Sequence, residues 1–289
     1  MHAARNACLT ASVSLILAAC GQQAPQPTSA APSASPVIAA PTTAAAPAPA
    51  STVPLPGDHA VTKRYKITIT LPKLAAADQP LADALRTTAD NAKRQFMQAL
   101  PDPTQLPEFA NRQLELLLDF KVSAQTPAFT SVRETGMQDT GGAHPLPVQG
   151  TFVFDRKAGK LIALADLFTD PDSARKALAN FAHDALLKRF LASAPKPGEG
   201  SPEALREWKA NMLQMLDDGT KPTSVNYSTF IVRAGATASD ASPGITLVFP
   251  PYQVAPYVDG TQTVDVPSNV FAHYLKPGYA GDFASSATR

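Results

Sequence analysis

Residues 247–267 read LVFPPYQVAPYVDGTQTVDVP and decide the local fold, because they specify a strand, a compact turn and a returning strand. The apolar run at the start predicts the first strand. Pro250 and Pro251 end it, since proline donates no hydrogen bond to a β-ladder. The turn breaks at Asp259–Gly260. From Thr261 to Val266 polar and apolar residues alternate, which predicts a second strand with one buried face.

Hydrophobic periodicity outside this hairpin predicts further strands and three amphipathic helices. Ser173 is expected to be the N-cap of the second helix and Ser201 that of the third, with Gly219 as the stop signal of the third helix. The pattern predicts an α+β fold with antiparallel and mixed sheets and two closely packed subdomains. The expected strands cover residues 65–71, 114–124, 129–137, 149–155, 160–164 and 227–232, and the expected helices cover 81–100, 178–190 and 201–219.

The first twenty residues resemble a bacterial lipoprotein signal. Arg5 precedes a short apolar run, and Leu17-Ala18-Ala19-Cys20 follows it, which is the order of a cleavable signal peptide that ends in a lipobox. The resemblance implies cleavage before Cys20 and a lipid on its sulfur that anchors the chain to a membrane. Gly21, in place of aspartate, favours the outer membrane, with the protein facing the periplasm. The alternative is an ordinary signal peptide that contains a cysteine.

Charge and cysteine content exclude several kinds of partner and site. The chain has 25 Lys and Arg against 24 Asp and Glu, and this balance argues against nucleic acid as a partner. Its 2 cysteines are Cys8 and Cys20; the first leaves with the signal peptide and the second takes the lipid. The folded part is therefore expected to have no disulfide and no thiolate site. No H-E-x-x-H pair exists, so we expect no metal and no cofactor.

Three sequence landmarks carry a resemblance to a known family. They are Gly141-Gly142-Ala143-His144-Pro145, the segment GKLIALADLF at residues 159–168, and the segment FPPYQVAPY at residues 249–257 with Gly260. Together they resemble the paired extracytoplasmic module of RsiV-type anti-sigma factors, which also precedes the catalytic domain of PdaC-type peptidoglycan deacetylases. The resemblance covers residues 60–277 and implies an α+β module that binds lysozyme in the first family and is an accessory in the second.

Composition and this resemblance together predict the domain organisation. Residues 22–57 carry no charge and consist mostly of Ala, Pro, Ser and Thr, so they are expected to be disordered. We expect a lipoprotein signal peptide at 1–19, a lipidated cysteine and disordered tether at 20–59, an N-terminal PdaC-like subdomain at 60–145, a C-terminal RsiV-like subdomain at 146–277 and a tail at 278–289. We expect this chain to contain neither the deacetylase catalytic domain nor a transmembrane helix with a sigma-binding segment.

The candidate binding residues lie in two of the three landmarks: Gly141, Gly142, His144, Tyr252, Tyr257 and Gly260. Exposed tyrosines would suit a surface for sugars or proteins, whereas buried tyrosines would only pack the turn; the sequence leaves both open. His144 fits a turn histidine that bonds to the backbone better than it fits a general base. Trp208 and the methionines near it are expected in the core.

The catalytic motifs are incomplete, so we expect no catalytic residue and no enzyme. Asp139-Thr140-Gly141 lacks the second aspartate of an aspartic protease. Ser173 and Lys176 fit S-x-x-K, but the companion motifs of that enzyme class are missing. The sequence favours a non-catalytic lipoprotein whose head binds peptidoglycan or a lysozyme-like protein. The alternatives are a structural envelope protein with a protein partner, and a peptidoglycan hydrolase that uses His144 with Asp139 or Asp166.

Overall fold

The computed structural model describes residues 52–54, 57–102, 104, 106–109, 111–196, 198–237 and 239–284. The predicted signal peptide and Cys20 lie outside these residues. Every helix and strand reported below belongs to one unit, which spans Pro49–Arg289.

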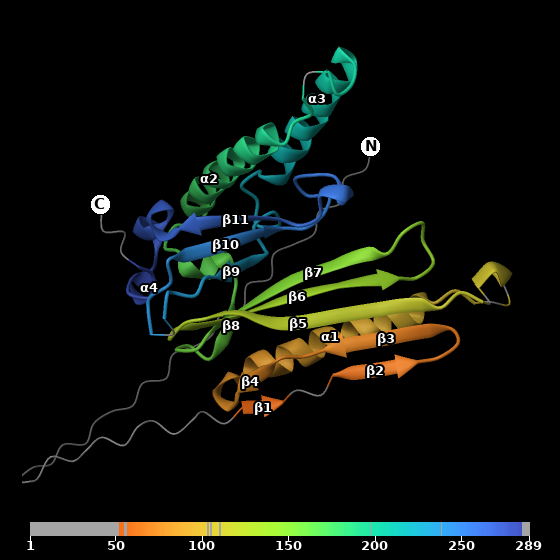
Figure 1. The fold of residues 1–289 in the computed structure, drawn as a ribbon. Coiled ribbons are helices and arrows are strands. Elements are labelled where there is room, and N and C mark those ends of the chain that lie inside the picture. Colours follow the sequence, from red (N-terminus) through yellow and green to blue (C-terminus); the bar gives the residue numbers. More distant parts are fainter. Residues whose placement is uncertain are drawn as a thin grey trace, which may run out of the picture. The chain divides into compact units, whose positions relative to one another are not determined.

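A six-stranded mixed sheet is the largest element of the fold (Figure 1). Its strand order is β2-β3-β5-β6-β7-β8. β3 and β5 run parallel, because the helix between them returns the chain to the same end of the sheet, and the other neighbours are antiparallel. The strands are β2 (Asp58–Val61), β3 (Tyr65–Thr70), β5 (Leu114–Gln125), β6 (Phe129–Asp139), β7 (Leu146–Asp155) and β8 (Lys160–Ile162). The short strands β1 (Thr52–Pro54) and β4 (Lys73–Ala75) pair with each other.

Helix α1 (Gln79–Ala99) packs on one face of this sheet (Figure 1). Its apolar positions recur at helical spacing, and Leu81, Leu85 and Phe96 are completely buried. The facing residues come from alternate positions of β5, which bury one side of the strand. This packing gives the first of two large apolar clusters.

A three-stranded antiparallel sheet, of order β11-β10-β9, lies on the opposite face. It consists of β9 (Phe230–Val232), β10 (Gly244–Phe249) and β11 (Gln262–Pro267). The Ser131 hydroxyl on β6 donates to the Val232 carbonyl (3.2 Å) and accepts from the Val232 N–H (3.1 Å). The next residue, Val132, packs in the cluster under α1, because successive side chains of a strand point to opposite faces.

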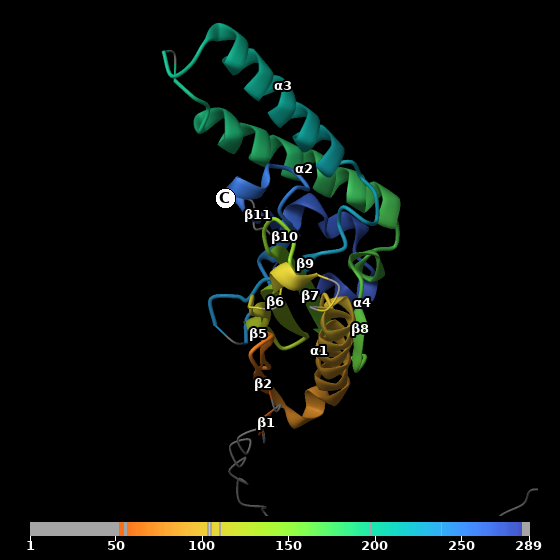
Figure 2. The same cartoon turned by 90° about the vertical axis from the view of Figure 1, so that its right-hand side faces the viewer.

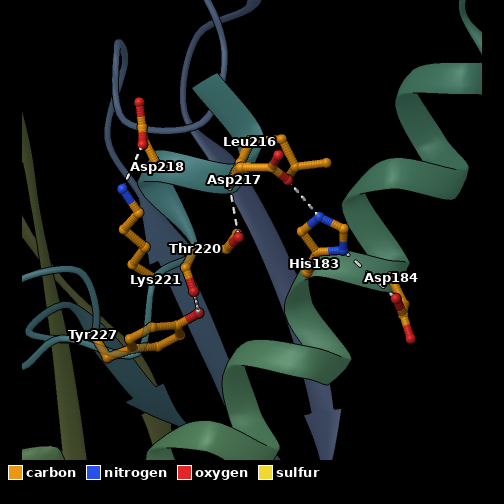
Figure 3. Close-up of polar contacts among 8 residues, drawn as sticks. All are labelled: His183, Asp184, Leu216, Asp217, Asp218, Thr220, Lys221 and Tyr227. Atoms are coloured by element: carbon orange, nitrogen blue, oxygen red, sulfur yellow. Dashed lines mark hydrogen bonds and ion pairs between the residues drawn. The ribbon is translucent and has the colours of Figure 1, made fainter. Parts of the chain in front are cut away.

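Helices α2 (Pro171–Ala192) and α3 (Pro202–Gly219) form a helical hairpin (Figure 2). Apolar residues of α2 pack against the three-stranded sheet in the second large cluster. The two helices are linked by a contact of 2.9 Å between His183 Nε2 and Asp217 Oδ1 (Figure 3). This pair, together with the apolar contacts, orients α3 relative to α2.

The C-terminal end of α3 is held by a buried tyrosine (Figure 3). Tyr227 Oη donates to the Thr220 carbonyl at 2.8 Å, and Thr220 Oγ1 donates to the Leu216 carbonyl at 2.7 Å. Burial raises the pKa of the Tyr227 hydroxyl, so it remains a neutral donor. The Tyr227 hydroxyl thereby gives the Thr220 carbonyl at the helix end a hydrogen-bond partner, while the Leu216 carbonyl also accepts the Thr220 N–H at 3.0 Å.

Short helices complete the described part of the chain. Each is a single turn that changes the direction of the backbone between longer elements. They are the 3₁₀-helices η1 (Ala76–Asp78), η2 (Pro107–Phe109), η3 (Leu164–Leu167), η4 (Tyr257–Asp259), η5 (Ser268–Val270) and η6 (Ala272–Tyr274), and the α-helix α4 (Pro277–Ala280). No helix among the described residues combines the length and the apolar composition that crossing a membrane requires.

The predicted α+β class, with mixed and antiparallel sheets and three long helices, is confirmed. Three local predictions were wrong. The strand expected at 160–164 ends at Ile162, and Leu164 already belongs to η3. The strand expected at 227–232 begins only at Phe230, because Tyr227 turns into the core. The N-cap of α2 is Asp170, whose carboxylate accepts the Ser173 N–H at 3.1 Å, so Ser173 is the capped residue rather than the cap.

The ordered elements extend beyond the predicted boundaries. β1 and β2 begin inside residues 20–59, which the sequence assigns to a tether. Residues 278–284, assigned to a tail, are held to the folded unit, since Phe283 is buried and the Ala284 N–H bonds to the Ser242 carbonyl at 2.7 Å. The predicted subdomain boundary at 145/146 falls in the turn between β6 and β7, which pair in one sheet. The division into two subdomains stays a prediction.

Candidate functional site

The loop between β10 and β11 is anchored to the body of the protein on its inner side. Val254 and Ala255 are buried in the second cluster. The Gln253 amide donates to the carbonyls of Gly219 (2.9 Å) and Asn226 (3.0 Å). The loop therefore has a defined position before any ligand binds, although it carries exposed side chains.

Gly219 is the last residue of α3, as predicted, but the reason for glycine is a close contact. A Cβ atom at this position would lie 2.0 Å from the Gln253 carbonyl oxygen and 2.7 Å from the Val254 side chain. The helix end and the loop can approach so closely only because residue 219 has no side chain.

The backbone of the same loop is bent at two positions with positive φ. Tyr252 has φ of 71°, which is rare for a residue with a side chain and costs about 1–2 kcal/mol. The Tyr252 N–H donates to the Ala255 carbonyl at 3.1 Å, and the Gly260 N–H donates to the Tyr257 carbonyl at 3.0 Å. Gly260 has φ of 65°, so glycine suits its conformation. Tyr252 and Tyr257 are exposed in this loop, whereas Val254 and Ala255 between them are buried.

A second segment, the turn between β6 and β7, reaches the same place. Gly141 has φ of 101°, and a Cβ there would lie 2.3 Å from the Phe109 ring. Its N–H donates to the Asp139 carboxylate at 2.9 Å, and Arg112 donates to both oxygens of that carboxylate at 3.0 Å. Gly142 has no such constraint, since a Cβ there would make only an ordinary contact with the His144 carbonyl.

His144, Tyr252 and Tyr257 form one group of rings, which we call the aromatic surface. The ring centroids of His144 and Tyr257 are 4.9 Å apart and nearly stacked, and those of Tyr252 and Tyr257 are 5.5 Å apart. The Tyr252 hydroxyl lies 3.5 Å from His144 Nε2, which is too long for a strong hydrogen bond. His144 Nδ1 lies 3.1 Å from the Pro145 carbonyl. Residues that are 108 positions apart in the sequence therefore meet here.

These rings face solvent. Tyr252 is 54% exposed, Tyr257 39% and the neighbouring Val258 87%. The sequence left open whether the tyrosines pack the turn or form a surface, and the structure gives the second arrangement. Of the candidate residues, Gly141 and Gly260 shape the two segments, while the side chains of the aromatic surface are available to a ligand.

The carboxylates considered for a hydrolase have other partners. Asp139 binds Arg112 and the Gly141 N–H. Asp166 accepts the Ala163 N–H at 2.8 Å and caps η3. In the described residues the polar contacts of His144 are with Pro145 and Tyr252, and none involves a carboxylate. Within the same residues no three His, Cys, Asp or Glu side chains are grouped to hold a metal ion.

A cavity of about 530 Å³ lies beside the loop, between it and the helices α2 and α3. Its lining includes Arg189 from α2, Trp208 and Met212 from α3, and Asp259 and Gln262 from the loop and β11. The loop thus contributes to two neighbouring features, the aromatic surface and this cavity.

Sequence reasoning missed this cavity because it assigned Trp208 to the core. Met212 is buried, but Trp208 and Met215 are only partly buried and line the cavity. Apolar residues at positions 208, 212 and 215 have the same spacing whether they pack against a neighbour or border a hollow. The polar residues Arg189 and Asn211 were the available signal, yet their proximity depends on how the helices pack.

Comparison with protein families gives a match in the C-terminal half. Residues 165–269 match the family model described as "Protein of unknown function (DUF3298)". The matched segment contains α2, α3 and all three strands of the smaller sheet. It includes the cavity and the tyrosines, whereas His144 precedes it.

A curated relative is the peptidoglycan-N-acetylmuramic acid deacetylase PdaC of Bacillus subtilis strain 168. The two sequences are 23% identical over 202 residues, which is 70% of this chain and 38% of the relative. The chain therefore spans well under half of that protein's length. The predicted resemblance to the deacetylase family and to an uncharacterised domain is confirmed.

Two solved structures of DUF3298 family proteins are also similar. The structure from Bacteroides fragilis NCTC 9343 has a TM-score of 0.49 and 15% identity, and the match covers 74% of this chain and 85% of the other. The structure from Pseudomonas aeruginosa PAO1 has a TM-score of 0.45 and 17% identity, with coverage of 81% and 98%.

Proposed function

We propose that this chain, which carries a DUF3298 domain at residues 165–269, is a non-catalytic protein of the cell envelope that binds peptidoglycan. The observation that carries the proposal is the aromatic surface, in which two distant segments place His144, Tyr252 and Tyr257 together in solvent. The relationship to a peptidoglycan deacetylase supports cell-wall material as the ligand.

The chemistry of the aromatic surface suits a glycan. Aromatic rings present apolar faces on which the C–H face of a sugar ring can stack, and hydroxyl and imidazole groups at the ring edges can bond to sugar hydroxyls. The anchored loop lowers the entropy that binding would otherwise cost, because the backbone is already ordered. A non-catalytic role agrees with the structural partners of Asp139 and Asp166.

The proposed location follows from the N-terminal sequence. A lipid on Cys20 would anchor the chain to the outer membrane facing the periplasm, and the uncharged segment after it would act as a tether. Such a tether would let the folded unit reach the peptidoglycan layer.

A lysozyme-like protein is the second candidate ligand, favoured by the apolar side chains next to the rings. Val258 is 87% exposed and Leu146 is 56% exposed. Exposed tyrosines with neighbouring apolar residues also suit the centre of a protein interface. A structural envelope protein with another partner remains as an alternative, as does a hydrolase that would use His144.

The test is co-sedimentation of the full chain, kept in detergent, with purified peptidoglycan, and in parallel with glycan strands freed of their peptides. Tyr252→Gly and Tyr257→Ala should each weaken binding by about tenfold. Tyr252→Gly is suited to this test, because glycine accepts the φ of residue 252 without strain. The control for loss of an exposed apolar side chain is Val225→Ala, since Val225 is 77% exposed in the connection after α3.

His144→Ala is compared with His59→Ala, an exposed histidine on β2. We expect weaker binding only in the first variant. Absence of binding by the unmodified chain, or equal binding by all variants, would contradict the proposal. Capture of c-type lysozyme that depends on the same tyrosines would favour the second candidate. Release of soluble sugar or peptide products, lost in His144→Ala, would support the hydrolase instead.

A further inference from the structure

The cavity beside the loop has an apolar floor. Phe190, Met212 and Ala255 are almost completely buried there, and Trp208 and Met215 are partly exposed along its wall. Its volume of about 530 Å³ falls within the range of small-molecule sites. Methionine side chains adapt to irregular apolar ligands, so this floor suits aliphatic groups better than a sugar ring.

A positive charge borders the cavity and is held in a fixed position. The Arg189 guanidinium donates to Gln262 Oε1 at 3.3 Å and to the Thr263 carbonyl at 3.0 Å. Both acceptors are neutral, and no carboxylate in the described part of the chain forms an ion pair with Arg189. An arginine with free donors and no internal anion is suited to an external carboxylate.

A negative charge borders the same cavity. Asp259 is exposed on η4, and within the described residues its carboxylate has neither an ion pair nor a hydrogen bond. Gln262 connects the two charged positions, because its amide donates to the Asp259 carbonyl at 2.8 Å while its oxygen accepts from Arg189. The exposed Asn211 side chain adds an amide that can pair with a peptide group.

We propose that this cavity binds a short peptide that has a free carboxylate at its end and an ammonium group on a side chain. The identity of this peptide rests on the proposed function. It is the peptide part of peptidoglycan, whose strands carry peptides with small apolar residues, an acidic end and a diamino acid. Arg189 takes the carboxylate, Asp259 takes the ammonium and the floor takes the aliphatic groups. The aromatic surface on the same loop then takes the glycan.

Trp208 offers a direct measurement. It is the only tryptophan of the chain and it lines the cavity, so its fluorescence reports occupation of this site. The full chain is titrated with three peptides. They are Nα-acetyl-Lys-D-Ala-D-Ala, its C-terminal amide, and the same peptide with its lysine side-chain amine acetylated, which removes the ammonium charge. We expect a saturable change in emission with the first peptide, and affinity at least about tenfold lower for the amide.

Arg189→Gln should lower the affinity for the acid by about tenfold or more and leave the weak binding of the amide unchanged. The substitution and the amidation of the peptide each remove the same arginine–carboxylate pair, so the second change has nothing further to remove. Asp259→Asn should likewise lower the affinity for the peptide with the free lysine ammonium and leave the binding of the side-chain-acetylated peptide unchanged. The control is Arg86→Gln, at a surface arginine of α1, which should change neither affinity. Circular dichroism of each variant shows whether the fold is retained.

Equal binding of acid and amide, or no saturable change in emission, would overturn the assignment of this cavity. Failure of the peptide site can be distinguished from failure of the proposed function. If glycan strands without peptides still bind through Tyr252 and Tyr257 while the peptide does not bind, only the peptide site falls. If neither glycan nor peptide binds, both proposals fall.

Discussion

Replacement of Gly219 by alanine tests the close contact that anchors the loop between β10 and β11. Alanine is favoured over glycine in a helix by about 0.5–1 kcal/mol, so propensity alone predicts a more stable protein. The contact predicts the opposite, because the new Cβ would lie 2.0 Å from a backbone oxygen, at Gln253. A contact below 3.0 Å requires a shift of about 1 Å, since real Cβ atoms essentially never come so close.

The contact should outweigh propensity, because the loop cannot retreat freely. Val254 is buried next to Gln253, and the Gln253 amide bonds to the helix end itself. Overpacking of this kind costs about 1–3 kcal/mol, so we expect Gly219→Ala to lose about 1–2 kcal/mol net. For a unit of this size that corresponds to a fall in Tm of about 2–8 °C.

Thermal unfolding followed by circular dichroism measures this effect, with Gly278→Ala in α4 as the matched control. A Cβ at residue 278 would meet nothing within 4 Å, so this variant should keep or slightly raise its Tm. Gly219→Ala should also weaken peptidoglycan binding, because the displaced loop carries Tyr252 and Tyr257. A Gly219→Ala protein that is as stable as the unmodified chain would refute the reasoning.

Three further predictions concern buried charge and the membrane anchor. Burial raises the pKa of the Glu134 carboxyl, so its contribution to stability is complete below the ordinary pKa of about 4.3 and is lost as the pH rises through the folded-state pKa. Glu134→Gln should therefore gain stability relative to the unmodified chain as the pH rises above about 4.3, measured in urea titrations. Asp78 is buried and accepts from Thr130 Oγ1 (3.1 Å) and Arg156 Nε (3.4 Å), so Asp78→Ala should cost about 1–3 kcal/mol in the same assay. Cys20→Ser should release the protein from membranes on fractionation without changing its circular dichroism spectrum.

Each of these predictions has an outcome that would contradict it. A stability difference for Glu134→Gln that does not vary with pH would mean that burial does not raise the pKa of this carboxyl. For Asp78→Ala the comparison is Asp83→Ala, which breaks an exposed pair with Arg86 worth at most about 1 kcal/mol; equal losses would contradict the buried network. Retention of Cys20→Ser in the membrane fraction would contradict the lipid anchor.

Periodicity alone predicted most of the elements in the folded part. The alternation of apolar residues at positions 114–120 is local information, and β5 follows from it directly. The Ser201 cap of α3 was predicted because its hydroxyl needs only a nearby N–H, and it accepts that of Ala204 at 3.2 Å. The cap of α2 was misplaced because Asp170 and Ser173 are both good capping residues within one turn.

The sequence names the residues of the proposed binding site but does not predict their geometry. His144 and the two tyrosines were candidates, yet their meeting depends on how the β6–β7 turn and the β10–β11 loop pack, which no local pattern encodes. The exposure of the tyrosines could not be predicted for the same reason. The position of Trp208 in the wall of the cavity was missed because helical spacing does not distinguish a buried stripe from the wall of a cavity.

The most direct test of the central claim is co-sedimentation of the full chain with purified peptidoglycan, with Tyr252→Gly and Tyr257→Ala measured beside Val225→Ala. The account predicts that the unmodified chain and Val225→Ala pellet with the peptidoglycan, while both tyrosine variants bind about tenfold more weakly. Binding that is unaffected by loss of either tyrosine, or no binding by the unmodified chain, would contradict the claim that the aromatic surface recognises the cell wall.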